Sequence, residues 1–192
     1  MNYRKLTLKD DLYQVAELIY LTDKFIYPTW FENYENYKQV LVDLIKSEGT
    51  LFNYNNILIA EEMGKIYGIL VYIKEDFENT YNYDHLRNIN DNFKYTIDNY
   101  ILPCVNHLEK NIIYITNVSV IPEKRRKYIA TNLINMCFDI NPNRNFVLQV
   151  LALNIPAVNC YLKQGFQIKK YDKGFNKSGK RKPKIFEMEK FK

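Results

Sequence analysis

The chain contains two strand-like segments separated by a helical pattern, and this arrangement limits the fold more than any other feature. Residues 111–120 and 146–151 have the composition of strands, and the second segment is almost wholly apolar. A strand of that kind is covered on both faces. Between the two segments, residues 129–140 place their apolar side chains on one face of a helix. The sequence therefore predicts a strand-helix-strand unit within a covered sheet.

The pattern outside this unit extends it to a complete fold. Residues 3–8 form the first predicted strand, and two helices follow, the second ending before Gly49. Residues 56–61 and 66–74 flank a turn and predict a hairpin. Further strands are predicted at the end, giving the order βααββ, a helical insertion, then βαβαββ. This order predicts an α/β fold with a mixed sheet flanked by helices on both faces.

The length of 192 residues suits one domain with a normal core. We expect a single domain over residues 1–192, with a helical insertion at about 76–110. No stretch approaches the roughly 18 consecutive apolar residues of a membrane span. We therefore expect a cytoplasmic protein with no membrane contact.

The cysteines and histidines predict neither disulfides nor a metal site. Cys104, Cys137 and Cys160 have no close pairing, which favours reduced thiols in the cytosol. His85 and His107 are not at metal-ligand spacing, and no cysteine lies close enough in sequence to complete a site with them. The sequence thus favours a protein without metal.

A cationic loop joins the strand at residues 111–120 to the next helix. Pro122 marks a turn, and residues 124–127 are all Lys or Arg before the helix begins at Ile129. The free N–H groups at a helix N-terminus and the helix dipole favour a bound phosphate. The net charge of +5 is modest, and the second basic cluster, at residues 177–184, is expected to be a solvated loop.

Two motifs in this region resemble those of the GNAT acetyltransferase superfamily. The first is a loop, Arg/Gln-x-x-Gly-x-Gly/Ala, that follows a strand ending in Val-x-Pro; here Arg125 and Ala130 take its first and last positions. The second is Asn-x-x-Ala-x-x-x-Tyr-x-x-x-Gly-Phe. The chain matches it at every named position, which are Asn154, Ala157, Tyr161, Gly165 and Phe166. The two motifs span residues 118–166.

The resemblance implies a fold and a cofactor. A GNAT-like fold has a mixed central sheet of about seven strands with helices on both faces, and its fourth and fifth strands splay apart in a V. The implied cofactor is acetyl-CoA, whose pantetheine arm would pair with the backbone of Val118 and Val120 while helix N–H groups hold the pyrophosphate. The residues implied in cofactor binding are Val118, Ser119, Val120, Arg125, Arg126, Lys127, Tyr128, Ile129, Ala130, Thr131, Asn154 and Tyr161.

Three positions carry the expected chemistry or depart from the family pattern. Tyr128 replaces the first glycine of the loop, and its side chain either lies beside the nucleotide or crowds the loop. Asn117 stands where some members have a carboxylate base. An amide cannot take up a proton at physiological pH, so Asn117 is expected to orient a water or the amine. Tyr161 is the predicted general acid for a departing thiolate, with packing on the sheet as the alternative.

The acceptor pocket is expected to form from the aromatic loop at residues 27–31 and the insertion. Tyr27 and Trp30 are predicted to pack against an aliphatic or cationic amine, with core packing as the alternative for at least one of them. Glu61, Glu62 and Glu75 are candidates for the missing base, with a surface position as the alternative. Glu75 is also assigned to the substrate site.

These features predict an acyl-CoA-dependent N-acyltransferase that moves acetyl from acetyl-CoA to a primary amine by direct attack. The amine belongs to a small molecule or a peptide, and a monomer or homodimer without nucleic acid is expected. Two alternatives stay open. Tyr128 and Asn117 are compatible with a non-catalytic acyl-CoA sensor or interaction module of the same fold. The basic clusters are compatible with a nucleic-acid-binding domain, which would show steeply salt-dependent binding.

Overall fold

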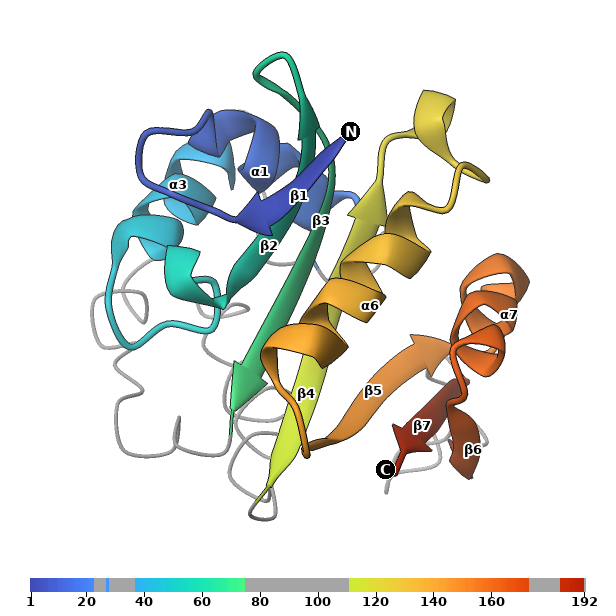
Figure 1. The fold of residues 1–192 in the computed structure, drawn as a ribbon. Coiled ribbons are helices and arrows are strands. Elements are labelled where there is room, and N and C mark those ends of the chain that lie inside the picture. The colour runs from blue at the N-terminus through green and yellow to red at the C-terminus, as the bar shows by residue number, and fades with distance from the viewer. Residues whose placement is uncertain (23–26, 28–36, 75–110, 173–183, 192) are drawn as a thin grey trace.

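The computed structural model describes residues 1–22, 27, 37–74, 111–172 and 184–191, and these contain a seven-stranded sheet (Figure 1). Its order is β1-β2-β3-β4-β5-β7-β6. Neighbouring strands are antiparallel except β4 and β5, which are parallel, so the predicted mixed sheet is confirmed. The strands are β1 (Asn2–Lys5), β2 (Ile57–Glu62), β3 (Lys65–Lys74), β4 (Ile112–Val120), β5 (Asn145–Leu151), β6 (Gln167–Asp172) and β7 (Ile185–Lys190).

Helices cover both faces of the sheet, as predicted. The α-helices are α1 (Leu12–Tyr20), α3 (Tyr37–Lys46), α6 (Ile129–Ile140) and α7 (Ile155–Lys163), and short 3₁₀ helices lie at Tyr54–Asn56 and Pro122–Lys124. One core forms where α1 and α3 pack on residues such as Ile59 and Val71. A second core forms where α6 and α7 pack on the other face, against residues such as Leu70 and Ile115. Figure 1 shows α6 in front of the sheet and α1 and α3 behind it.

The hairpin predicted between β2 and β3 is present. Met63 and Gly64 form its turn, and both have positive φ, 52° and 78°. Two consecutive residues in this region make the tight turn whose twist matches that of the flanking strands. The insertion predicted at 76–110 follows β3 and lies outside the described residues.

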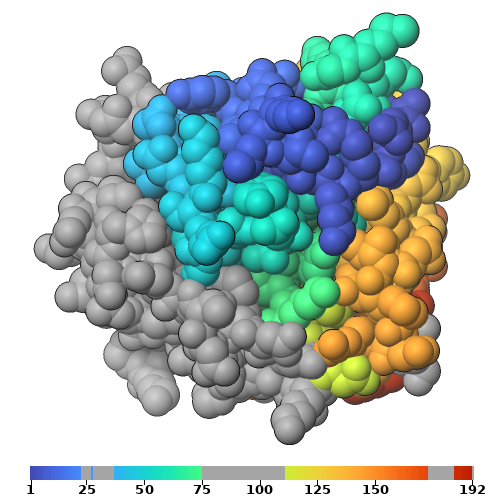
Figure 2. Space-filling view, turned by 60° about the vertical axis from the view of Figure 1, so that its left-hand side comes forward, coloured from blue at the N-terminus to red at the C-terminus, as the bar shows by residue number. Residues whose placement is uncertain are grey.

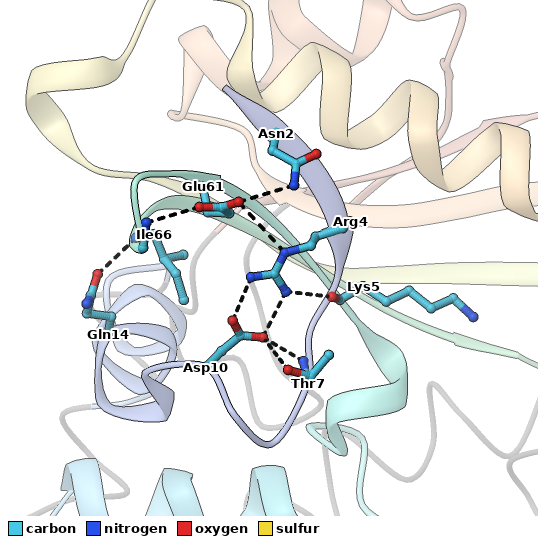
Figure 3. Close-up of polar contacts among 9 residues, drawn as sticks. Asn2, Arg4, Lys5, Thr7, Asp10, Gln14, Glu61 and Ile66 are labelled. Atoms are coloured by element: carbon cyan, nitrogen blue, oxygen red, sulfur yellow. Dashed lines mark hydrogen bonds and ion pairs between the residues drawn. The ribbon is translucent and has the colours of Figure 1, made fainter.

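A polar cluster ties β1 to the start of α1 (Figure 3). Arg4 donates to both carboxylate oxygens of Asp10, from Nη2 at 2.6 Å and from Nη1 at 2.9 Å. The Thr7 N–H donates to the same carboxylate at 2.8 Å. Asp11 caps α1 by accepting from the N–H groups of Tyr13 and Gln14. The connection between the first strand and the first helix is therefore held by side chains at both ends.

β4 and β5 pair over only part of their length. The ladder runs from the Ile112 pair to the Ile115–Leu148 pair and stops there. Beyond that point β4 stays paired with β3 as far as Val120, and β5 stays paired with β7 as far as Leu151. The two strands diverge in Figure 1 because each remains attached to a different neighbour. This divergence confirms the splay predicted between the fourth and fifth strands.

The N-terminal strand also lies beside α6. The Asn132 side-chain amide donates to the Tyr3 hydroxyl at 2.9 Å, and Figure 2 shows β1 (dark blue) against α6 (orange). This contact joins the first strand to the helix that follows the cationic loop. In the described part of the chain, no helix combines the length and apolar character needed to cross a bilayer.

Candidate functional site

The main chain of β4 presents hydrogen-bonding groups where β5 turns away. The Ile121 N–H donates to the Tyr67 carbonyl at 3.0 Å, and in an antiparallel pair alternate residues bond to the same neighbour. Val118 and Val120 are the intervening residues, so their N–H and C=O groups point toward the side that β5 has left. Such an edge is satisfied by water or by an extended ligand that binds as a further strand.

A β-bulge at Thr116 sets the direction of Asn117. Val71 pairs with Asn117 while its neighbour Tyr72 pairs with Ile115, so Thr116 is an extra residue in β4. Because of this extra residue, the side chains after it point to the face opposite the one that regular alternation would give. Ile115 lies in the core beneath α6, whereas Asn117 contacts the end of α1 on the opposite face.

The Asn117 side chain is buried, 8% exposed, and is held from the α1 side. Its Nδ2 donates to Thr22 Oγ1 at 2.7 Å and to Tyr27 Oη at 3.0 Å. Both amide hydrogens are thereby used, and within the described residues nothing donates to Oδ1. Ser119, two residues further on, is also buried and pairs with Ile69 of β3.

The cationic loop leaves β4 through the 3₁₀ helix Pro122–Lys124 and leads into α6. Arg125 folds back, and its Nε donates to the Val120 carbonyl at 3.1 Å. Arg126 and Lys127 are exposed and make no ion pair within the part of the chain that the structure describes. Two cations therefore stand next to the helix N-terminus, where they favour an anionic ligand.

Tyr128 occupies the N-cap of α6 in the left-handed region, with φ 59° and ψ 12°. Arg126, two residues earlier, also has a positive φ of 61°. Glycine adopts this region without steric cost, whereas a residue with a Cβ is disfavoured there by about 1–2 kcal/mol. The Tyr128 side chain is 76% exposed. A backbone conformation that glycine favours is thus present at this motif position, and a solvent-facing tyrosine adopts it.

The first turn of α6 has no side-chain cap. Its first main-chain hydrogen bond runs from the Asn132 N–H to the Tyr128 carbonyl at 2.9 Å. The N–H groups of Ile129, Ala130 and Thr131 precede that bond and carry the positive end of the helix dipole. Together with the neighbouring cations, these groups fit a pyrophosphate.

The second half of α7 lies beside this turn. Thr131 Oγ1 lies 3.9 Å from Cys160 Sγ, so its side chain faces α7. Asn154 is the N-cap of α7, and its Oδ1 accepts from the Ala157 N–H at 3.4 Å. Helix capping is therefore one role of Asn154, and its predicted cofactor contact stays a prediction. Gly165 follows the helix with φ 87°, the left-handed conformation that glycine favours at helix ends.

Tyr161 is buried on the α7 face that packs toward the sheet. Its ring makes an edge contact with Phe166, with centroids 5.9 Å apart. Burial, with a smaller contribution from Cys160, raises the pKa of Tyr161 above its ordinary value. The phenol is therefore protonated throughout the physiological range, and within the described residues its hydroxyl has no hydrogen-bond partner. A raised pKa makes this phenol a weaker acid than an exposed tyrosine, and its burial fits the packing alternative, while its role as a proton donor stays a prediction.

The predicted acceptor residues are described only in part. Trp30 and Glu75 lie outside the described residues. Tyr27 is 4% exposed, and its ring centroid lies 6.1 Å from that of Tyr20 and 6.4 Å from that of Phe52. Tyr27 is therefore a core residue, the alternative that the sequence left open, and its hydroxyl reaches Asn117.

Glu61 and Glu62 contact the N-terminal end of the chain. Glu62 pairs with the terminal amine at 3.1 Å, which lowers the pKa of this carboxyl, and Glu61 accepts from the first strand. Ile57 is the β2 residue level with Asn117, since both pair with Val71. Glu61 lies about 13 Å further along β2, at about 3.3 Å per residue. These two candidates for the base thus occupy surface positions away from Asn117.

Two residues of this region carry roles that the sequence interpretation did not assign. A Cβ on Gly68 of β3 would lie 2.9 Å from Ile129 Cγ2 and 3.1 Å from the Ser119 carbonyl oxygen. Glycine therefore allows α6 to begin close to the sheet, and an isolated glycine in a strand is a signal for such an approach. No sequence pattern marks Thr22 in this way, because its hydrogen-bond partner Asn117 lies 95 residues away in the sequence.

The comparison with protein families finds one that covers most of the chain. The sequence model of the acetyltransferase (GNAT) family matches residues 19–166, which include the cationic loop and α7. No curated protein sequence matches the chain.

Solved structures with this arrangement include several N-acetyltransferases. The N-acetyltransferase from Staphylococcus aureus Mu50 has a TM-score of 0.74 and 16% identity, covering 98% of this chain and 100% of its own. The PaiA N-acetyltransferase from Thermoplasma acidophilum, solved with coenzyme A, has a TM-score of 0.56 and 18% identity, and the match covers 100% of this chain and 98% of that protein. The ribosomal-protein-S18-alanine N-acetyltransferase from Escherichia coli has a TM-score of 0.58 and 12% identity, and the match covers 98% of this chain and 92% of that protein. At these identities the likeness concerns the fold.

Proposed function

The chain belongs to the acetyltransferase (GNAT) family, and from this premise we propose that it is an acyl-CoA-dependent N-acyltransferase that acetylates a primary amine by direct attack. One juxtaposition carries the proposal. The strand edge at Val118 and Val120 leads directly into an uncapped helix N-terminus flanked by Arg126 and Lys127. An extended arm that ends in a pyrophosphate matches both parts.

The proposed cofactor is acetyl-CoA. Val118 and Val120 would bind the arm through their main-chain groups, and the N–H groups of residues 129–131 would bind the pyrophosphate. Arg126 and Lys127 add charge complementarity. When bound, acetyl-CoA would supply an acetyl group activated as a thioester, whose C–S bond would break as the amine nitrogen forms the amide bond and loses one proton to water.

The chemical roles fall to three residues of β4 and α7. Tyr161 holds a proton on Oη at neutral pH, as a tyrosine of ordinary or raised pKa does, and we propose that it gives that proton to the departing thiolate. The Val118 N–H, which points away from β3, is suited to polarise a carbonyl. Asn117 has no basic group, so the amine is proposed to arrive deprotonated and to be oriented by this side chain.

The acceptor is proposed to be the amine of a small molecule or a peptide. The S18-alanine acetyltransferase among the similar structures acts on a protein, according to its name, which makes a peptide a natural test substrate. Trp30 and Glu75 remain proposed residues of the acceptor side. The cytoplasm is the proposed location.

Thiol release measures the proposed reaction. The purified chain is incubated with acetyl-CoA and one of three amines, namely diaminobutane, an amino-acid amide or a short peptide with a free N-terminus. We expect steady-state release of CoA thiol with at least one of them. Tyr161→Phe keeps the buried ring and removes the proton donor, and should lower kcat by about 10²-fold, the lower end of general acid catalysis.

The CoA affinity of Tyr161→Phe, measured by calorimetry, is the matched control and should equal that of the parent. An unchanged kcat in this variant would assign Tyr161 to packing alone. CoA binding without thiol release from any amine would instead support the non-catalytic acyl-CoA sensor.

A further inference from the structure

The end of α1 is joined to Asn117 by a short chain of hydrogen bonds. Thr22 follows α1, and its Oγ1 donates to the Ile19 carbonyl at 2.6 Å, a contact that satisfies one of the free carbonyls of the last helical turn. The Asn117 amide meets the same Oγ1 at 2.7 Å. Both distances are those of good hydrogen bonds.

This chain determines which end of the Asn117 amide faces Thr22. A hydroxyl has one hydrogen, and the Thr22 hydrogen is used by Ile19, so Oγ1 can only accept from Asn117. The group that faces it must therefore be the NH₂ of the amide. The opposite rotamer would place two oxygens 2.7 Å apart with no hydrogen between them.

The second amide hydrogen is also engaged, because Nδ2 donates to Tyr27 Oη at 3.0 Å. The NH₂ group has no further hydrogen to offer. Oδ1 is then the part of Asn117 that remains to meet another molecule, as an acceptor. The bulge at Thr116 places this amide on the face opposite α6, beside the length of β4 that β5 has left.

We propose that Thr22 is a positioning residue for the acceptor amine. Its hydroxyl locks the Asn117 amide so that Oδ1 accepts an N–H of the incoming amine and directs the nitrogen lone pair toward the acyl carbon. This role rests on the proposed function, since it concerns the acceptor of the same reaction. It needs no proton uptake by Asn117, in agreement with the chemistry of an amide.

Thr22→Val removes the hydroxyl and keeps the shape of the side chain, while Thr22→Ser keeps the hydroxyl. With the amine that gives the fastest thiol release, Thr22→Val should lower kcat/KM for the amine by about tenfold, and its CoA affinity should stay at the parental value. Thr22→Ser should retain activity near that of the parent. In an Asn117→Ala background, Thr22→Val should cause no further loss, because the two residues act as a unit.

The proposal would be overturned if Thr22→Val lowered kcat/KM equally in the parent and in the Asn117→Ala background. It would also be overturned if Thr22→Ser lowered kcat/KM as much as Thr22→Val does. The side-chain amide signal of Asn117 in an ¹H–¹⁵N spectrum, assigned by its absence in Asn117→Asp, provides a readout without turnover. It should shift in Thr22→Val and not in Thr22→Ser, and an unmoved signal would also overturn the proposal. If the parent protein releases no thiol, the proposed function is wrong. The Asn117 amide signal tests the role of Thr22 separately, because it does not depend on turnover.

Discussion

Tyr128 stands at the motif position where the family has glycine, and its backbone has a conformation that glycine favours. Its φ of 59° lies where glycine is favoured, and its ring is largely in solvent. The ring therefore gains little packing to offset the left-handed conformation. Since this residue precedes the free N–H groups of α6, we propose that the conformation serves the approach of a phosphate rather than the stability of the fold.

Replacing Tyr128 by glycine should stabilise the protein. We expect Tyr128→Gly to raise the free energy of unfolding by about 1 kcal/mol, because the steric cost of the Cβ at positive φ disappears. Urea unfolding at neutral pH measures the change. Tyr128→Ala is the matched control, since it removes the ring and keeps the Cβ, and it should show little gain. A glycine variant less stable than the alanine variant would contradict this explanation.

Among the elements, the position of α6 depends on the strand beneath it. Gly68 of β3 lies against Ile129, the first residue of α6, and a Cβ would come within 2.9 Å of its side chain. Side chains in a packed core yield little, so the helix start would have to move. The position of the proposed anion site at this end of α6 therefore depends on a glycine of another element.

Gly68→Ala should weaken CoA binding and destabilise the fold by about 1–3 kcal/mol, the usual range for overpacking. Calorimetry with CoA and urea unfolding measure the two effects. The double variant Gly68→Ala with Ile129→Ala removes the clashing Cγ2, so its destabilisation should be smaller than the sum of the single changes. Additive effects would indicate that the clash with the Ser119 carbonyl dominates.

The Arg4–Asp10 pair at the start of α1 predicts a dependence of stability on pH. Hydrogen bonds from Arg4, with support from Thr7, lower the pKa of Asp10 to about 2, below the usual value of about 3.9. The contribution of the carboxylate is therefore complete above about pH 4 and is lost as the pH falls toward 2. Arg4 is 34% exposed, so solvent screening reduces this contribution to about 1 kcal/mol.

Asp10→Asn should lower the free energy of unfolding by about 1 kcal/mol at neutral pH. The difference from the parent should shrink below about pH 4, because the unfolded chain takes up a proton on Asp10 there, whereas the folded protein does so only near pH 2. Urea unfolding across this range measures both proteins. A gap that stays constant down to about pH 2 would show that the loss comes from packing rather than from charge.

At the scale of the molecule, the site exists because the sheet divides. β4 belongs to the antiparallel group β1-β2-β3-β4, and β5 belongs to the group β5-β7-β6, with a short parallel ladder between them. Each group twists with its own neighbours, so the two central strands part beyond Ile115 and Leu148. A ligand along this edge of β4 would complete the hydrogen bonds of the Val118 main chain and of the Val120 N–H, whereas the Val120 carbonyl already accepts from Arg125.

CoA should therefore stabilise the whole molecule. A ligand present at a hundredfold excess over its Kd contributes about 2.7 kcal/mol, which corresponds to a rise in Tm of about 5–10 °C for a protein of this size. Thermal unfolding with CoA measures the rise. Pantetheine contains the arm without the pyrophosphate and should give a clearly smaller rise. Equal effects of the two ligands would argue against the anion site at α6.

The structural features that depend only on residues close together in the sequence can be predicted from the sequence alone. Strand and helix periodicity predicts the mixed sheet, because it reflects which face of each element is buried. The cationic loop that leads into a helix N-terminus can be predicted for a similar reason, since the cations and the helix start are adjacent along residues 122–131. The cap at Asn154 and the left-handed Gly165 are local in the same way.

Tertiary structure alone decides what surrounds Asn117. A regular strand would alternate its side chains without interruption, and the bulge at Thr116 that reverses them depends on the pairing with Val71. Thr22 reaches Asn117 across 95 residues of sequence, and Glu61 is separated from it by the register of β2. Sequence patterns report burial and local hydrogen bonding, whereas the partners of a buried polar side chain depend on how distant elements pack together.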